Sequence, residues 1–298
     1  MDWLDGYRAD SITRALKARA DWDMPRTLRL QLDQRAVAWD DLRAAVLSAP
    51  DSDPDAYQAL AMLRAWDGCV SADSPAATVY ELFLAEMEGR VARVKAPRTF
   101  AAILGERLGP FTPYNFLCYR RTGHLARLLR EQPAGWFSRP WPEETADALA
   151  MVVRRLRTQY GNNPADWAFG RLRPLILHHP LARKRVLASI FNLGPIPFGG
   201  DADTINQGAV LPLDPLAPVD NIASLRMVVD VGAWHNSRFS LPGGQSGNPF
   251  SSHYADLLAL WQRGEGVPIA WTEEEIRDAT RETLQLSPLS SRESGGSA

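Results

Sequence analysis

The stretch SLPGGQSGNPFSSHYADLLALW, residues 240–261, changes from a polar, glycine-rich run to an apolar run within one segment. Its glycines permit a tight backbone path, and Ser251 or Ser252 can cap a following helix, HYADLLALWQRG, that we expect to end at Gly264. Such a loop could hold an anion, carry a nucleophile or turn a corner. The rest of the chain has to decide among these three roles.

Length and composition describe a globular protein. The chain has 298 residues, of which 45% are apolar and 23% charged, and ten are Trp, so it can bury a large core in one or two domains. A net charge of -2 provides no general positive field, which excludes nucleic acid and an anionic membrane as expected partners. Cys69 and Cys118 are too few for a disulfide framework or a Cys-rich zinc site, and we expect two buried thiols, with one disulfide left open.

Residues 1–160 have a helical pattern. Asp53 and Ser74 are predicted N-caps because a proline follows each at the first helical position, and Asp10 or Ser11 is a predicted cap of an earlier helix. A single long stripe is expected from apolar residues at helical steps: Leu28, Leu32, Trp39, Leu42 and Val46. The last helix of this half should end at Gly161 with five side chains inward: Leu149, Val152, Val153, Leu156 and Tyr160.

The stretch near 96–142 is rich in Pro, Gly and aromatic residues, and we expect it to be a hinge without a long regular element. Residues 161–286 change period and predict a strand-rich region, with strands at RPLILHH (173–179), SLRMVVDV (224–231) and SRFSLP (237–242). A helix from 272 is indicated by the capping-box spacing of Thr272 and Glu275. The tail 287–298 is predicted to be disordered, and the fold class is α+β.

Two loops contain candidate binding residues. In GGDADTIN, residues 199–206, Asp201 and Asp203 could face a hard cation, but the remainder of a calcium loop is missing, so we expect a turn held by Asx hydrogen bonds. In GGQSGNPF no Lys follows the glycines to reach a phosphate. Ser246 lacks the second glycine of a nucleophile elbow, because Asn248 occupies that place.

The five histidines are His124, His178, His179, His235 and His253, and no helical pair four residues apart indicates a zinc protease. His178 and His179 should point to opposite faces if their segment is a strand. His253 is expected where the glycine loop meets a helix, and the positive helix end there disfavours its protonation. A hydrolase using Ser246 with His253 is one hypothesis from these residues.

Several segments together resemble the penicillin acylase (penicillin amidase) family. They are GYRADSI (6–12), MLRAWDG (62–68), DSPAATVYELF (73–83), YGNNPADWAFGRLRPLILHHPL (160–181), GGDADTIN (199–206) and SLRMVVDVGAWHNSRFSLPGGQSGNPFSSHYADLLALWQRGEGVPIAW (224–271). They follow the family's order over nearly the whole chain. The chain departs from the family's usual residues at Ser11, Asn248 and Leu257, where the family has Arg, His and Gln.

The resemblance implies an N-terminal-nucleophile amidohydrolase with an αββα sandwich, in which a precursor cleaves itself into a small and a large subunit. The first Ser of the large subunit then attacks an amide carbonyl while its own α-amine serves as base. Residues 161–286 would complete the sandwich as the C-terminal part of the large subunit. Substrates would be N-acyl small molecules, either acylated β-lactams or acyl-homoserine lactones.

By the same resemblance, the nucleophilic Ser, the oxyanion Asn and the small subunit would precede Met1, so we expect no catalytic residue in this chain and no turnover by it alone. Its partner would be the N-terminal portion of the precursor or a separately encoded half. The alternative is a non-catalytic split or decayed relative that acts as a binding or scaffold partner. Family-motif residues without an assigned role are Arg8, Gly200, Asp201, Asp203, Asn206, Gln245, Ser246 and His253.

We expect no cofactor or metal in the chain, with calcium possible in the full precursor. The N-terminus has no apolar signal region, and no apolar run of about 20 residues predicts a membrane span. The location would be periplasmic for an exported precursor and cytoplasmic for this chain alone. The stretch 240–261 is then expected to be an architectural corner, with a contribution to the substrate cleft as the alternative.

Overall fold

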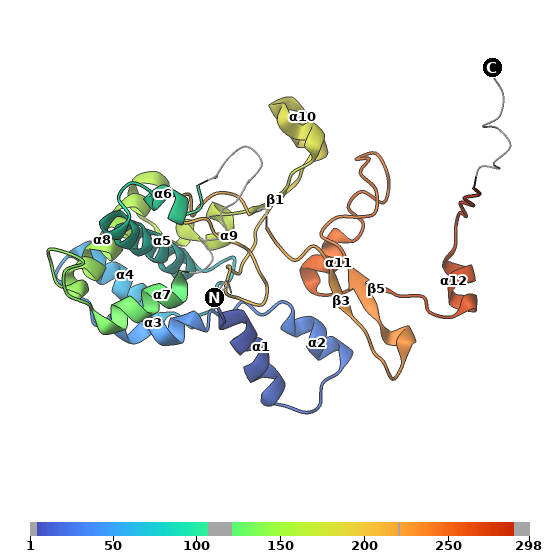
Figure 1. Ribbon diagram of the computed structural model, residues 1–298. Coiled ribbons are helices and arrows are strands. Elements are labelled where there is room, and N and C mark those ends of the chain that lie inside the picture. The colour runs from blue at the N-terminus through green and yellow to red at the C-terminus, as the bar shows by residue number, and fades with distance from the viewer. Residues whose placement is uncertain (1–4, 107–120, 220, 289–298) are drawn as a thin grey trace, which may run out of the picture.

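The computed structural model describes residues 5–106, 121–219 and 221–288, with helices in the first part and short strands in the second (Figure 1). The helices of the first part are α1 Tyr7–Lys17, α2 Met24–Leu30, α3 Ala38–Leu47, α4 Pro54–Ala65, α5 Pro75–Lys95, α6 Phe100–Ile103, α7 Thr122–Glu131 and α8 Trp141–Tyr160. The second part contains α9 Phe169–Leu172, β1 Leu175–Leu177, α10 Arg185–Phe191, β2 Leu193–Ile196, β3 Arg226–Val228, β4 Arg238–Ser240, α11 Leu258–Arg263, β5 Val267–Pro268 and α12 Glu273–Ala279. The tail predicted to be disordered comprises residues 287–298. Of these, 289–298 lie outside the described ranges, so the disorder stays a prediction.

Several predicted helix ends are confirmed. The Asp53 side chain accepts hydrogen bonds from the first backbone N–H groups of α4, and Ser74 does the same for α5. Gly161 follows α8 with a φ of 89°, and Gly264 ends α11 in the left-handed conformation. Thr272 forms the predicted capping box at α12. These ends follow from local chemistry, because each cap satisfies backbone groups within its own turn.

Two predictions for the first helices are wrong. Since α1 begins at Tyr7, Asp10 and Ser11 lie inside the helix and cap nothing. The single apolar stripe is broken between α2 and α3, because residues 34–36 pair with residues 68–70 instead of continuing a helix: Ala36 N–H donates to the Gly68 carbonyl at 2.9 Å. From the expected stripe, only Trp39, Leu42 and Val46 reach the core.

The expected hinge contains regular structure. Helix α7 spans ten residues within 96–142 and buries Leu125, Leu128 and Leu129. The prolines restrict only their own positions and the residue before each, so the proline-free run between Arg121 and Pro133 can be helical. Tyr160 at the end of α8 is 36% exposed and does not point inward, whereas the other four predicted residues of that helix are buried.

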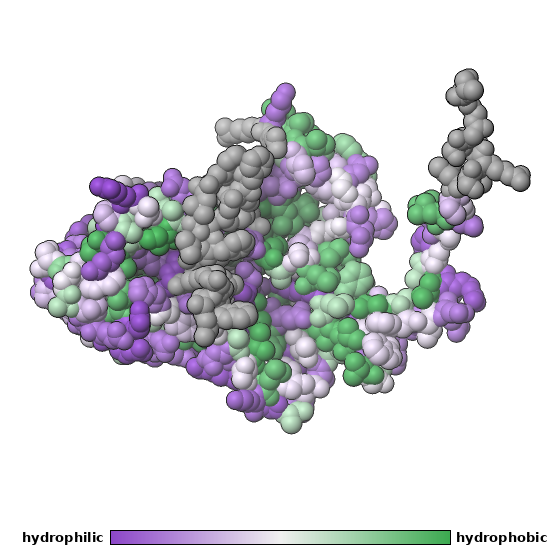
Figure 2. Space-filling model, in the orientation of Figure 1, coloured by the Kyte–Doolittle hydropathy of each residue, from purple (hydrophilic) through white to green (hydrophobic). Residues whose placement is uncertain are grey.

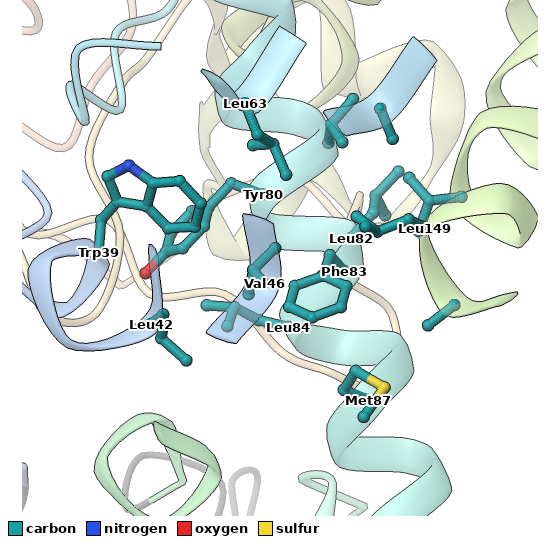
Figure 3. Close-up of a cluster of buried hydrophobic side chains, with 14 of the residues drawn as sticks. Trp39, Leu42, Val46, Leu63, Tyr80, Leu82, Phe83, Leu84, Met87 and Leu149 are labelled. Carbon is teal, nitrogen blue, oxygen red and sulfur yellow. The ribbon is translucent and has the colours of Figure 1, made fainter. Parts of the chain in front are cut away.

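The large core surrounds α5. Helix α4 packs along α8, both contact α5, and α3 packs against α7. Figure 3 shows Trp39 from α3 beside Tyr80 of α5, with Phe83 and Met87 further along the same helix. The rings of Trp39 and Tyr80 meet edge to face with centroids 5.7 Å apart, and Trp66 lies 4.8 Å from Tyr80. Helix α5 is therefore buried along most of its length, and the run from Ala77 to Ala85 is buried on every side of the helix, Glu81 included.

The second part has two small antiparallel sheets, β1–β2 and β3–β4–β5. The three predicted strands are present, but as β1, β3 and β4 they are only three residues each, while β2 and α10 were not predicted. The α+β class is confirmed. The separation into regions 1–160 and 161–286 stays a prediction.

The core of this second part is small. Its fully buried cluster comprises Leu175, Phe198, Val219 and Trp261. Hydrophobic residues gather on the surface of this part in Figure 2, and the exposed ones include Leu225, Met227, Val231, Trp234, Phe250 and Trp271. Apolar surface of this extent is typical of a face that another segment covers. Among the described helices, none is long and apolar enough to cross a membrane.

Candidate functional site

The segment of residues 199–208, which we call the motif loop, joins the two parts of the chain. The Gly200 N–H donates to the Val70 carbonyl at 2.7 Å, and Gly200 has a φ of +85°. A Cβ atom there would lie 2.0 Å from the carbonyl oxygen of Asn206. The position therefore requires glycine for both backbone conformation and space.

Asp201 folds the motif loop by Asx hydrogen bonds, as predicted. Its Oδ1 accepts from the backbone N–H groups of Asp203 and Thr204, both at 2.8 Å. Thr204 Oγ1 accepts from the Asp201 N–H at 2.9 Å and donates to the Asn206 carbonyl at 3.0 Å. One carboxylate oxygen of Asp201 is thus already used by the turn itself.

Two more carboxyl groups lie buried beside this turn. Glu81, on α5, is 3% exposed and hydrogen-bonded to Asp201, and Asp203 is 8% exposed. Burial, followed by the charge of Asp201, raises the pKa of Glu81 well above its usual range. The same two causes raise the pKa of Asp203 to about 7, against a hydrogen bond from Thr122 that lowers it. The raised pKa favours the protonated form of Glu81 next to the Asp201 carboxylate.

These carboxyl groups do not form a metal site. Within the described ranges, no group of three or more His, Cys, Asp or Glu side chains is arranged to hold a metal ion. Asp201 is occupied by backbone donors and by Glu81. Calcium therefore has no fitting ligand set among these described residues.

Two buried arginines clamp the motif loop from the other side. Arg173, 1% exposed after α9, donates to the carbonyls of Gly208, at 2.8 Å, and of Ala209. Arg226 of β3, 3% exposed, donates to Asn206 Oδ1 at 2.6 Å and to the Trp261 carbonyl. Each guanidinium satisfies carbonyl or amide oxygens that the irregular loop would otherwise leave unpaired.

Sequence analysis missed Glu81, Arg173 and Arg226 as parts of this cluster. Their signal was present, because each is a charged residue inside an otherwise apolar run: TVYELF, RPLIL and LRMVV. Arg8 of α1 joins the cluster by donating to the Gln207 side chain. The structure thus brings together five of the eight predicted family-motif residues: Arg8, Gly200, Asp201, Asp203 and Asn206.

The other three motif residues lie in the glycine loop, residues 243–256. Gln245 is exposed. The Ser246 N–H donates to the His253 carbonyl at 3.0 Å, and the Ser246 hydroxyl accepts from the Asn248 N–H at 3.1 Å. The His253 ring instead contacts Asp256, with Nδ1 2.8 Å from Oδ2. Among the described residues no hydrogen bond joins the Ser246 hydroxyl to the His253 ring, so the structure adds no support to the hypothesis of a Ser246–His253 nucleophile pair.

The predicted cap of the following helix is wrong. Helix α11 begins only at Leu258, and its N-cap, Leu257, makes no side-chain hydrogen bond, while Ser251 accepts from the His253 N–H within a turn. His253 is therefore not at a helix N-terminus, and the expected effect of the helix end on its protonation does not apply. The tight corner itself is present, since a Cβ at Gly244 would lie 2.0 Å from the His253 carbonyl oxygen.

The histidine pair lies beyond β1, which ends at Leu177, so the alternation of a strand does not govern it. His179 Nδ1 accepts from the Leu181 N–H at 3.1 Å, and its Nε2 lies 3.0 Å from the Gly247 carbonyl oxygen. His179 thereby connects its own segment to the glycine loop. Cys69 is a free, half-buried thiol whose pKa is raised by burial, and Cys118 lies outside the described residues.

Known protein families and relatives show where these loops occur. The model of the penicillin amidase family matches residues 1–278. The chain belongs to the penicillin amidase family. It is 32% identical over 250 residues to the acyl-homoserine lactone acylase QuiP of Pseudomonas putida (strain KT2440). The alignment covers 79% of the chain and 29% of that protein. It is 29% identical over 229 residues to the penicillin acylase 2 proenzyme of Pseudomonas sp. (strain SE83), covering 76% of the chain and 28% of the proenzyme.

The chain thus spans less than a third of the length of these relatives. A solved structure of a thermostable penicillin G acylase from Alcaligenes faecalis aligns with a TM-score of 0.55 and 20% sequence identity, over 96% of this chain and 53% of that one. At this identity the likeness concerns the fold alone. The motif loop and the glycine loop are therefore parts of a penicillin amidase fold.

Proposed function

We propose that the chain is the C-terminal section of an N-terminal-nucleophile amidohydrolase, and that it hydrolyses a non-peptide N-acyl amide together with a segment that carries the nucleophilic serine. The substrate class is an acyl-homoserine lactone or an acylated β-lactam. The family match over residues 1–278 carries this proposal, because it includes the segments that build both loops.

Two further observations support a partner segment. The chain covers less than a third of the length of a penicillin acylase proenzyme and of an acyl-homoserine lactone acylase to which it is similar. In addition, β3 and β5 are the edges of their sheet, and exposed apolar side chains lie beside them, including Met227 and Trp234. Unpaired strand edges with apolar neighbours favour coverage by further strands.

In this proposal the motif loop is a support for the catalytic part rather than a reacting group. Arg8 fastens α1 to the loop through Gln207, and Glu81 fastens the loop to α5. A segment that carries the reacting groups and packs on the motif loop would be supported by these contacts. Catalysis requires such support because the reacting groups must be positioned accurately.

The test compares the chain alone with the protein as it is made in its own cell. Purified residues 1–298 should release no dye from a phenylacetyl or fatty-acyl nitroanilide. Intact-mass measurement of the native protein should reveal a longer precursor product with a free N-terminal Ser, and that material should release dye. Strong dye release by the 298 residues alone would contradict the proposal.

The second candidate is a non-catalytic scaffold or binding partner for a separately encoded half. Ser11 favours it, because the family motif usually has Arg at this position, and Ser11 is buried at 6% exposure with no charge to offer. A native protein of 298 residues that forms a complex without amidase activity would support this candidate over the first.

A further inference from the structure

Arg226 is a buried cation that pairs with no acidic side chain among the described residues, and its guanidinium lies over the Trp261 ring, 4.0 Å from the centroid. Its hydrogen bonds go to the neutral oxygens of Asn206 and Trp261, and its Nε, closed off from solvent, has no hydrogen-bond partner. Burial lowers the pKa of Arg226 to about 10, and no neighbouring carboxylate acts to raise it. The group therefore remains charged at neutral pH with its charge unneutralised by the described residues, an arrangement that proteins rarely retain without a counter-ion.

A pocket of about 190 Å³ opens beside this guanidinium. Its apolar walls include Leu32, Phe198 and Trp261, and its polar lining includes Gln34 and Gln262. The rings of Phe198 and Trp261 are stacked, with centroids 5.8 Å apart and an angle of 14° between their planes. The pocket thus combines two aromatic side chains with one positive charge and no acidic side chain among its lining residues.

We propose that this pocket binds a small organic carboxylate, whose anionic head pairs with Arg226 and whose apolar body lies against Phe198 and Trp261. A guanidinium donates in a planar fork that matches a carboxylate, and each terminal nitrogen of Arg226 has a second N–H beyond the one it already uses. The apolar walls exclude a strongly hydrated inorganic anion as the best ligand, since its hydration would be lost without replacement. The proposal does not depend on the proposed amidase function.

A purely structural Arg226 makes a different prediction. In that case the arginine only ties β3 to Asn206 of the motif loop and to α11, and no added anion should change the protein. The two roles are therefore separated by ligand binding, and not by the stability of Arg226 variants, because both roles predict that removing a buried guanidinium destabilises the fold.

The experiment is fluorine NMR titration of the 298-residue chain with 4-fluorobenzoate and, as the uncharged control of the same shape, 4-fluorobenzamide. The expected result is saturable broadening and shift of the benzoate signal, with at least about tenfold weaker binding of the benzamide. Equal affinity of the two ligands, or no binding of the benzoate at millimolar concentration, would overturn the proposal.

A variant test uses Gln262→Glu, which adds a carboxylate to the pocket itself. Gln262 follows Trp261 on α11 and is exposed, so the substitution leaves the core unchanged. The new carboxylate should compete with the ligand and weaken benzoate binding about tenfold. Gln159→Glu on α8, outside the pocket lining, is the charge-matched control and should bind as the wild type does. Unchanged affinity in Gln262→Glu, or an equal loss in both variants, would contradict a site at Arg226.

Discussion

The buried Glu81 carboxyl of α5 faces the Asp201 carboxylate, and this interaction connects the motif loop to the central helix of the core. Both side chains are buried, and burial together with the Asp201 charge raises the pKa of Glu81. Stability should therefore depend on pH in a way that substitutions can isolate.

Glu81→Gln imitates the protonated acid and keeps a donor for Asp201. A carboxyl whose pKa is raised on folding stabilises fully below its unfolded value, and that contribution is lost as pH rises toward the folded value. The variant should match the wild type near pH 4 and be more stable at pH 9, as measured by urea denaturation. Glu282→Gln, at an exposed position, is the control and should change nothing. A loss of stability in Glu81→Gln that is equal at every pH would contradict the raised pKa of Glu81.

Asp203→Asn tests the second raised carboxyl. The pKa of Asp203 rises from 3.8 to about 7 on folding, so the folded state binds the proton more tightly between these values, and wild-type stability falls as pH increases through that window. The Asn side chain does not ionise and still accepts from Thr122. The difference in unfolding free energy between variant and wild type should grow in favour of the variant from pH 4 to pH 7 and then level off. A difference that is flat over this range would be the contrary result.

Gly200→Ala should destabilise the protein by about 2–4 kcal/mol, because the new methyl group meets the Asn206 carbonyl oxygen and the left-handed backbone disfavours a side chain. The matched control is Gly247→Ala, where an added Cβ has open space within 4 Å. Thermal unfolding of both variants provides the comparison. Similar melting temperatures for the two would show that the motif loop can adjust its backbone.

Arg173→Lys should cost about 2–4 kcal/mol in unfolding free energy, because one ammonium cannot reach the carbonyls of both Gly208 and Ala209 in the way a guanidinium does. Arg171→Lys is the control, since Arg171 lies on the surface and pairs only with Asp166 among the described residues. Chemical denaturation of the two variants checks the prediction. If Arg173→Lys costs no more than Arg171→Lys, the clamp on the motif loop is dispensable.

Sequence patterns predicted most helix ends and the Asx turn, because caps, prolines and glycines act within a few residues of themselves. Asp53, Ser74, Gly161 and Thr272 behave as their local chemistry requires. Predictions that needed partners distant in sequence were less successful. The break before Trp39 comes from backbone pairing with residues 68–70, and the helix in the expected hinge depends on burial of its apolar face.

The sequence by itself determined the family, the α+β class and the members of the motif loop, since these depend on residue types in a fixed order. Only the tertiary structure decided which motif residues meet. It joined Arg8, Asp201 and Asn206 with the unpredicted Glu81, Arg173 and Arg226, and it placed the His253 ring next to Asp256. The reason is that a buried polar group is stable only with a partner, and burial is a property of the packed chain that no local pattern contains.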